Sequence, residues 1–131
     1  MIDMQKYNKI TYDIIGAAME VHKELGFGFL EHVYQKGMEE ELEIRKIIFL
    51  SQSPVRVFYK SKEIAVYVPD LMINNVIVEL KSLEVVDYDQ IKKQIINYLV
   101  ATKKEVGLFI NFGKESLEYK RYIIPEKFQK K

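Results

Sequence analysis

The chain has 131 residues, of which 48% are hydrophobic, and its 20 lysines and arginines against 19 aspartates and glutamates give a formal net charge of +1. This length suits one hydrophobic core, so we expect a single domain over residues 1–131, and the near balance of charge means that nucleic acid would have to be held by a local patch. The absence of cysteine excludes disulfides and thiolate metal sites, and without a signal-peptide pattern or a run of roughly 20 apolar residues we expect a cytoplasmic protein with no membrane span.

Two helices are predicted in the first third of the chain. Over residues 8–25, and again over residues 30–45, apolar residues recur every three or four positions, which is the spacing of one helix face. Gly26 lies where a helix C-cap is usually found, so the first helix should end there. The residues expected to face inward are Ile10, Ile14, Ala17, Ala18, Val21 and Leu25 in the first helix, and Leu30, Val33, Tyr34, Met38 and Leu42 in the second.

Beyond Ile47 the apolar residues alternate with polar ones, which is the period of a strand. Two strands, at 55–60 and 64–68, flank a turn at Ser61-Lys62, and the second continues over 70–73 into a turn at Asn74-Asn75. Adjacent asparagines tolerate the positive φ of a two-residue hairpin turn, so the chain should return as a third strand of a meander over 76–81. A third helix over 87–102 and strands over 106–112 and 117–124 complete an α/β (α+β) fold of order ααβββαββ.

The Asn74-Asn75 turn predicts which residues face each other across this hairpin. If these two residues form the turn, residue 73 pairs with 76, and the same count brings Asp70 opposite Glu79. Lys81 lies two residues beyond Glu79 and therefore projects from the same face of the strand, while Leu80 points to the other face.

Asp70 and Glu79 predict a site for a divalent metal ion. Two carboxylates opposite one another, with Cβ atoms about 5 Å apart, repel unless a proton or a cation lies between them. Their oxygens, with the backbone carbonyl of Leu80, are the donors that Mg²⁺ or Mn²⁺ prefers, and no cysteine or paired histidine favours zinc.

Two alternatives compete with this interpretation. Pro69 cannot donate a hydrogen bond within a sheet and often marks a bulge, which would shift the register by one residue and redirect Asp70. Glu79 and Lys81 could also form a plain surface ion pair. A second Glu-x-Lys, Glu118-Tyr119-Lys120, has no aspartate in a matching hairpin, so the combination with Asp70 favours the metal site.

The motifs resemble those of a known family. Residues 28–34 read Gly-Phe-Leu-Glu-His-Val-Tyr and match G-x-x-E-x-x-Y, and Pro69-Asp70 followed by Glu79-Leu80-Lys81 matches PD…(D/E)XK. The chain thus resembles the GxxExxY proteins, a branch of the PD-(D/E)XK nuclease-like superfamily. The similarity extends through residues 94–99 and 107–113 to Lys120-Arg121. It implies a restriction-endonuclease-like core, with a mixed central β-sheet flanked by helices.

The resemblance adds two residues to the candidate catalytic set of Asp70, Glu79 and Lys81. Glu31 would join Asp70 and Glu79 as a metal ligand, although a glutamate at a helix start is also favoured by the helix dipole alone. Gln94 matches the glutamine that follows the core motif in this superfamily.

These residues predict a metal-dependent nuclease that hydrolyses phosphodiester bonds. In this hypothesis Mg²⁺ or Mn²⁺ lowers the pKa of a bound water, and the ion and Lys81 offset the negative charge that grows during in-line attack. Nucleic acid is the expected partner, with DNA favoured over RNA, and a duplex-cutting enzyme of this size would often be a homodimer. The alternative is a nucleic-acid-binding or regulatory module that keeps the fold without cutting, and a third interpretation is a protein partner that docks through the acidic residues 39–43.

Overall fold

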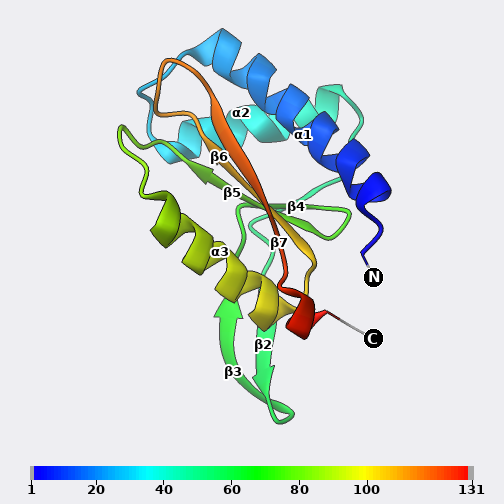
Figure 1. Ribbon diagram of the computed structural model, residues 1–131. Coiled ribbons are helices and arrows are strands. Elements are labelled where there is room, and N and C mark those ends of the chain that lie inside the picture. Colours follow the sequence, from blue (N-terminus) through cyan, green and yellow to red (C-terminus); the bar gives the residue numbers. More distant parts are fainter. Residues whose placement is uncertain (1, 130–131) are drawn as a thin grey trace.

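A computed structural model describes residues 2–129 of the chain (Figure 1). Ten helices and strands in the order ααβββββαββ precede a short 3₁₀ helix, which is two strands more than predicted. The elements are α1 (Met4–Leu25), α2 (Glu31–Ile44), β1 (Leu50–Ser51), β2 (Val55–Tyr59), β3 (Lys62–Tyr67), β4 (Leu71–Ile73), β5 (Val76–Lys81), α3 (Tyr88–Thr102), β6 (Val106–Asn111), β7 (Glu118–Ile123) and η1 (Glu126–Phe128).

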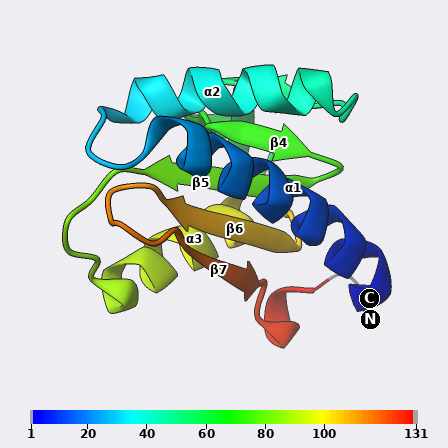
Figure 2. The ribbon, with the colours of Figure 1, turned by 90° about the horizontal axis from the view of Figure 1, so that it is seen from above.

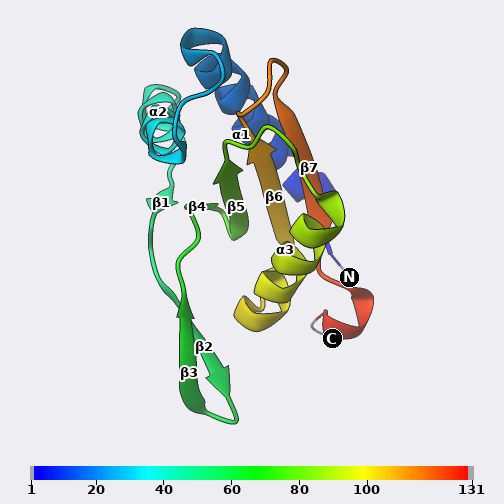
Figure 3. The same ribbon diagram turned by 90° about the vertical axis from the view of Figure 1, so that its left-hand side faces the viewer.

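A five-stranded mixed sheet forms the centre of the molecule. Its strand order is β1-β4-β5-β6-β7, with β5 and β6 parallel and the other neighbours antiparallel. Helices α1 and α2 cover one face of the sheet and α3 covers the other (Figures 2 and 3). The predicted α+β fold with a restriction-endonuclease-like core, a mixed sheet flanked by helices, is therefore confirmed. None of the helices that the structure describes is long and apolar enough to cross a membrane.

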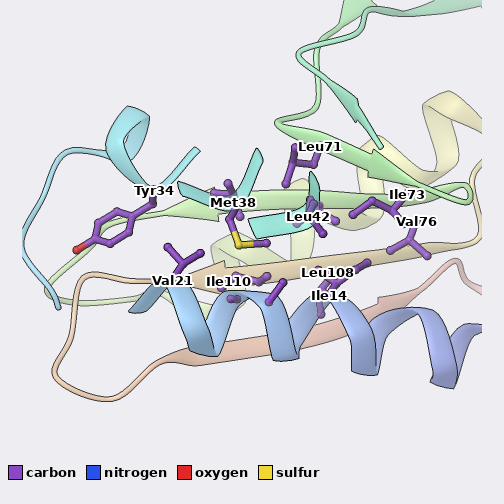
Figure 4. Close-up of a cluster of buried hydrophobic side chains, with 14 of the residues drawn as sticks. Ile14, Val21, Tyr34, Met38, Leu42, Leu71, Ile73, Val76, Leu108 and Ile110 are labelled. Atoms are coloured by element: carbon purple, nitrogen blue, oxygen red, sulfur yellow. The ribbon is translucent and has the colours of Figure 1, made fainter. Parts of the chain in front are cut away.

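The helical periodicity correctly predicts most of the residues that face the core. Ile14 and Val21 of α1 meet Met38 and Leu42 of α2 above the sheet, in the larger of two buried clusters (Figure 4). Leu30 is an exception, because its side chain is 72% exposed. It is the N-cap of α2 and its backbone is extended, so its side chain does not follow the buried face of the helix.

The predicted turn and register of the Asp70 hairpin are confirmed. Asn74 and Asn75 have φ values of 47° and 67°, the positive values that a tight hairpin turn requires. Ile73 pairs with Val76, and the ladder continues to Leu71 opposite Val78.

The three-stranded meander was wrong, because β2 and β3 form a separate two-stranded sheet. Strand β3 ends at Tyr67 and β4 begins at Leu71, with Pro69 between them; proline has no N–H to continue a ladder. The turn uses Lys60 and Ser61, which both have positive φ, one residue earlier than predicted. The resulting hairpin projects away from the central sheet (Figures 1 and 3). Strand β1, at two residues, is too short to give a periodic signal.

The loops that follow β5 and β6 are joined by a buried asparagine. Asn111 accepts from Leu83 N at 2.8 Å and donates to Leu83 O at 3.0 Å. The backbones approach so closely that a Cβ on Gly113 would lie 2.3 Å from the Leu83 backbone. Only glycine fits there without a shift of the chain that leads out of Lys81.

We therefore expect Gly113→Ala to lower the free energy of unfolding by roughly 1–3 kcal/mol, the usual effect of forcing extra atoms into a packed site. Urea unfolding measures the change, and Ser116→Ala, an exposed position of the same loop, is the matched control. Equal midpoints for Gly113→Ala and the wild type would show that the two loops are not held together in this way.

Candidate active site

The candidate site lies where β4 and β5 separate at one end of the sheet. Asp70 immediately precedes β4, whose ladder with β5 ends at the pair Leu71–Val78, one residue before Asp70 and Glu79. Its Oδ2 accepts a hydrogen bond of 2.7 Å from Leu80 N. The carboxylate thus takes the place of a strand partner for Leu80. The register of β4 with β5 is unshifted from Leu71 to Ile73, and regular pairing ends before Pro69 and Asp70.

Two glutamines that the sequence analysis did not single out hold Asp70 in position. Gln35 Nε2 donates to Asp70 O at 2.8 Å, and Gln52 N donates to the same oxygen at 3.2 Å. Gln35 is buried on α2, four residues after Glu31 and therefore on the same side of the helix. A polar residue on an otherwise apolar helix face was the sequence feature that could have identified Gln35.

Glu79 is mostly buried and lies on the face of β5 that α3 covers. Its Oε1 accepts a hydrogen bond from Tyr67 Oη. The Tyr67 ring stacks on Tyr98 of α3, with centroids 3.8 Å apart and an interplanar angle of 21°. The exposed Gln94 donates from Nε2 to Tyr98 Oη at 3.2 Å, so the structure links Gln94 to Glu79 only through two tyrosines. Nothing in the sequence marked Tyr67 as a site residue, apart from its position at the end of a strand.

The surroundings of Glu79 disfavour its charged form. Burial raises the pKa of the Glu79 carboxyl to about 7, with Lys81 opposing the rise and the nearby Glu31 carboxylate adding to it. A cation close to Glu79 would reverse this balance, because it stabilises the ionised carboxylate.

Glu31 and Lys81 approach each other across the gap between α2 and β5. Lys81 Nζ lies 4.0 Å from Glu31 Oε1, with both side chains partly exposed. Within residues 2–129 no ion pair joins Glu79 to Lys81, so the alternative of a Glu79–Lys81 surface pair is wrong. Glu31 is the first residue of α2, where the helix dipole also favours its charge.

Asp70 and Glu31 share a small pocket between α2 and the edge of the sheet. The pocket is lined by Glu31, His32, Gln35, Gln52, Asp70 and Leu80, and Glu79 is not among these residues. Since the N–H and C=O of one strand residue point to the same edge, and Leu80 N–H points to Asp70, the Leu80 carbonyl faces Asp70 as well. Three predicted donors thus lie on one side of β5, and Glu79 and Lys81 lie beside them.

The available donors fit Mg²⁺ or Mn²⁺ in kind. All are carboxylate or carbonyl oxygens, which hard divalent ions prefer, and the Leu80 N–H fixes Asp70 beside the Leu80 carbonyl. In the part of the chain that the structure describes, however, no group of three or more Asp, Glu or His side chains is gathered closely enough to hold an ion. Asp70, Glu31 and Glu79 are neighbours but do not converge on one point.

Comparison with known protein families gives a match over most of the chain. The family model described as PD-(D/E)XK nuclease superfamily matches residues 8–122, which extend from α1 into β7 and include the Asp70 hairpin. No curated protein matches the chain. With most of its length matched, the chain belongs to the PD-(D/E)XK nuclease superfamily.

Proposed function

We propose that this protein is a metal-dependent nuclease that hydrolyses phosphodiester bonds in nucleic acid, with DNA as the favoured substrate. Asp70, Glu79, Glu31 and the Leu80 carbonyl would hold Mg²⁺ or Mn²⁺, and Lys81 would act beside them. Membership of the superfamily supports nuclease-like chemistry, and the ligands and the substrate are our inference.

The observation that carries the proposal is the hydrogen bond from Leu80 N to Asp70 Oδ2. It fixes the carboxylate beside Leu80, the residue between Glu79 and Lys81. Among residues 2–129 the other oxygen, Asp70 Oδ1, has a single long contact, 3.4 Å from Gln52 Nε2. Asp70 is therefore oriented by the backbone while one oxygen stays available to a ligand. A side chain that binds a metal ion or a reacting water has to be held in a fixed orientation of this kind.

The side chains would have different roles in the reaction. A divalent ion, when bound, supplies a Lewis acid that makes water a better nucleophile and stabilises negative charge on the phosphate. Lys81 keeps an ammonium group within 4.0 Å of Glu31, and we propose that it holds the attacking water and offsets the charge that develops in the transition state. Tyr67, through its hydrogen bond to Glu79, would orient that carboxylate, and Gln94 would act through Tyr98 rather than on the substrate.

We also infer that the chain belongs to the GxxExxY branch, because the three motif residues act at one corner of the site. Gly28 has φ of 100° in the turn that leads into α2. Glu31 faces Lys81. Tyr34 donates from Oη to Gly26 O at 2.7 Å and accepts from Phe29 N at 3.3 Å, which ties the turn to the helix.

A non-catalytic nucleic-acid-binding or regulatory module is the second candidate. One observation favours it: among residues 2–129 the candidate ligands do not form a cluster of three that could hold an ion. A module that has lost cleavage would still bind nucleic acid without a metal, so metal dependence separates the two functions.

Incubation with end-labelled single- and double-stranded DNA, in EDTA and in Mg²⁺ or Mn²⁺, tests the proposal. We expect product only from wild-type protein with metal, and none from Asp70→Asn, which keeps an oxygen to accept from Leu80 N but loses the charge. Asp89→Asn, on the exposed start of α3, is the matched control and should cleave normally. Equal cleavage in EDTA, or by Asp70→Asn, would refute the proposal.

A further inference from the structure

The turn between α1 and α2 exposes a group of large apolar side chains next to the candidate site. Phe27 is 56% exposed, Phe29 46% and Leu30 72%. They border a hollow lined by residues 27–31 with Ser82, Glu84 and Gly113. Glu31 lines both this hollow and the pocket of Asp70, so the two are adjacent. Figures 1 and 2 show the turn at the end of the sheet where β5 and β6 finish.

Hydrogen bonds and ring contacts hold this turn against the rest of the protein. Ser82 Oγ donates to Phe29 O at 2.6 Å, and the Phe29 ring meets Tyr34 edge-on, with centroids 6.1 Å apart. Tyr34 in turn stacks on the buried Phe112, with centroids 4.5 Å apart. The exposed side chains are therefore presented by a fixed backbone, so little conformational freedom is lost when a ligand binds them.

We infer that the turn of residues 26–30 is a platform for an unpaired nucleobase. The inference rests on the proposed function and deepens it, because it names single-stranded or locally unpaired nucleic acid as the substrate class. An aromatic face can stack on any base, but only on a base that is not already stacked and paired within a duplex.

Charge favours a base over a phosphate in the hollow. Glu31 and Glu84 are both among its lining residues, and their carboxylates repel a phosphate. The exocyclic amino groups of cytosine, adenine and guanine are donors that a carboxylate can accept. The protein also has a net charge of only +1, so stacking has to supply binding that phosphate contacts supply in a basic nuclease. A base on the turn would bring its own phosphodiester towards Lys81, the cation beside Glu31.

The chain contains no tryptophan, so Phe27→Trp would give a single fluorescent reporter that keeps an aromatic surface. In EDTA, where no cleavage takes place, we expect a single-stranded oligonucleotide to quench this emission at a concentration at least about tenfold lower than the same sequence as a blunt duplex. Phe58→Trp, on β2 and similarly exposed at 58%, is the matched control and should not respond. Equal quenching by duplex and single strand, a response at Phe58→Trp, or a response to phosphatidylcholine vesicles instead of DNA would overturn the inference.

A variant that removes two of the exposed apolar side chains provides a second test. In Phe27→Ser with Leu30→Ser both changed side chains are exposed, and serine is a preferred N-cap residue at position 30, so α2 should remain stable by circular dichroism. We expect affinity for single-stranded DNA, measured by anisotropy in EDTA, to fall about tenfold or more, with no fall for Phe58→Ser. Unchanged affinity would overturn the platform even if the wild type cleaves DNA. Binding that depends on the platform in a protein that never cleaves would instead refute the proposed nuclease and leave the platform standing.

Discussion

Lys81→Ala is expected to lower kcat for DNA cleavage by roughly 10³-fold or more while the fold stays intact. Lys81 places a positive charge 4.0 Å from Glu31, and removing a group that stabilises developing charge has effects of this size. Its side chain is partly exposed, so the loss leaves no cavity in the core. Single-turnover cleavage of labelled DNA in saturating Mn²⁺ measures the effect.

The second Glu-x-Lys of the chain provides the control for this prediction. Lys120 also follows a glutamate by two residues, but it lies on β7, exposed beside the rings of Tyr88 and Tyr122. Lys120→Ala should cleave at the wild-type rate. Equal loss in the two variants would mean that both lysines act through general charge, and equal activity would remove Lys81 from the mechanism.

Glu79→Gln is expected to make the metal-free protein more stable at pH 8 but not at acid pH. The pKa of Glu79 is about 7 in the folded chain against an ordinary value of 4.5. Below pH 4.5 both states are protonated and the carboxyl contributes no difference. Between pH 4.5 and 7 the unfolded chain releases this proton while the folded chain keeps it, so the wild type loses stability over that range, and the loss levels off above pH 7. Glutamine does not titrate and loses none.

The size of this effect follows from the two pKa values. At about 1.4 kcal/mol per pH unit of separation, Glu79→Gln should gain about 3 kcal/mol of unfolding free energy at pH 8, and little at pH 4.5. Urea unfolding in EDTA measures the gain, with the exposed Glu40→Gln as the matched control. A difference that is the same at both pH values would show that Glu79 is not the titrating group.

The hairpin that carries the site could be predicted because its geometry is local. Asn74 and Asn75 adopt the positive φ that the turn requires, and a two-residue turn fixes every pair that follows. The pairs from Ile73–Val76 to Leu71–Val78 follow from that count. The hydrogen bond from Leu80 N to Asp70 does not, because Asp70 lies just outside the ladder. Helix periodicity similarly fixed which faces of α1 and α2 are buried.

The parts that could not be predicted depend on contacts between distant elements. Apolar and polar side chains alternate over residues 55–67 as they do in a strand of the central sheet. This pattern alone therefore does not show that β2 and β3 are separated from the central sheet at Pro69. The hydrogen bond from Tyr67 to Glu79 and the stacking of Tyr67 on Tyr98 require three elements to meet. Gln94 matches a motif by position, but its hydrogen-bond partner in the structure is Tyr98. The separation of Gln94 from Glu79 depends on how α3 packs on the sheet, which the motif does not contain.

Calorimetric titration of Mg²⁺ and Mn²⁺ tests the central claim, that Asp70 and Glu79 bind a divalent ion. The comparison is between the wild type at pH 8, the Asp70→Ala, Glu79→Ala double variant, and a control in which the exposed Asp89 and Glu40 are both changed to alanine. The account predicts saturable binding to the wild type and the control, and none to the double variant. Identical binding to all three proteins, or no binding to any of them, would contradict it.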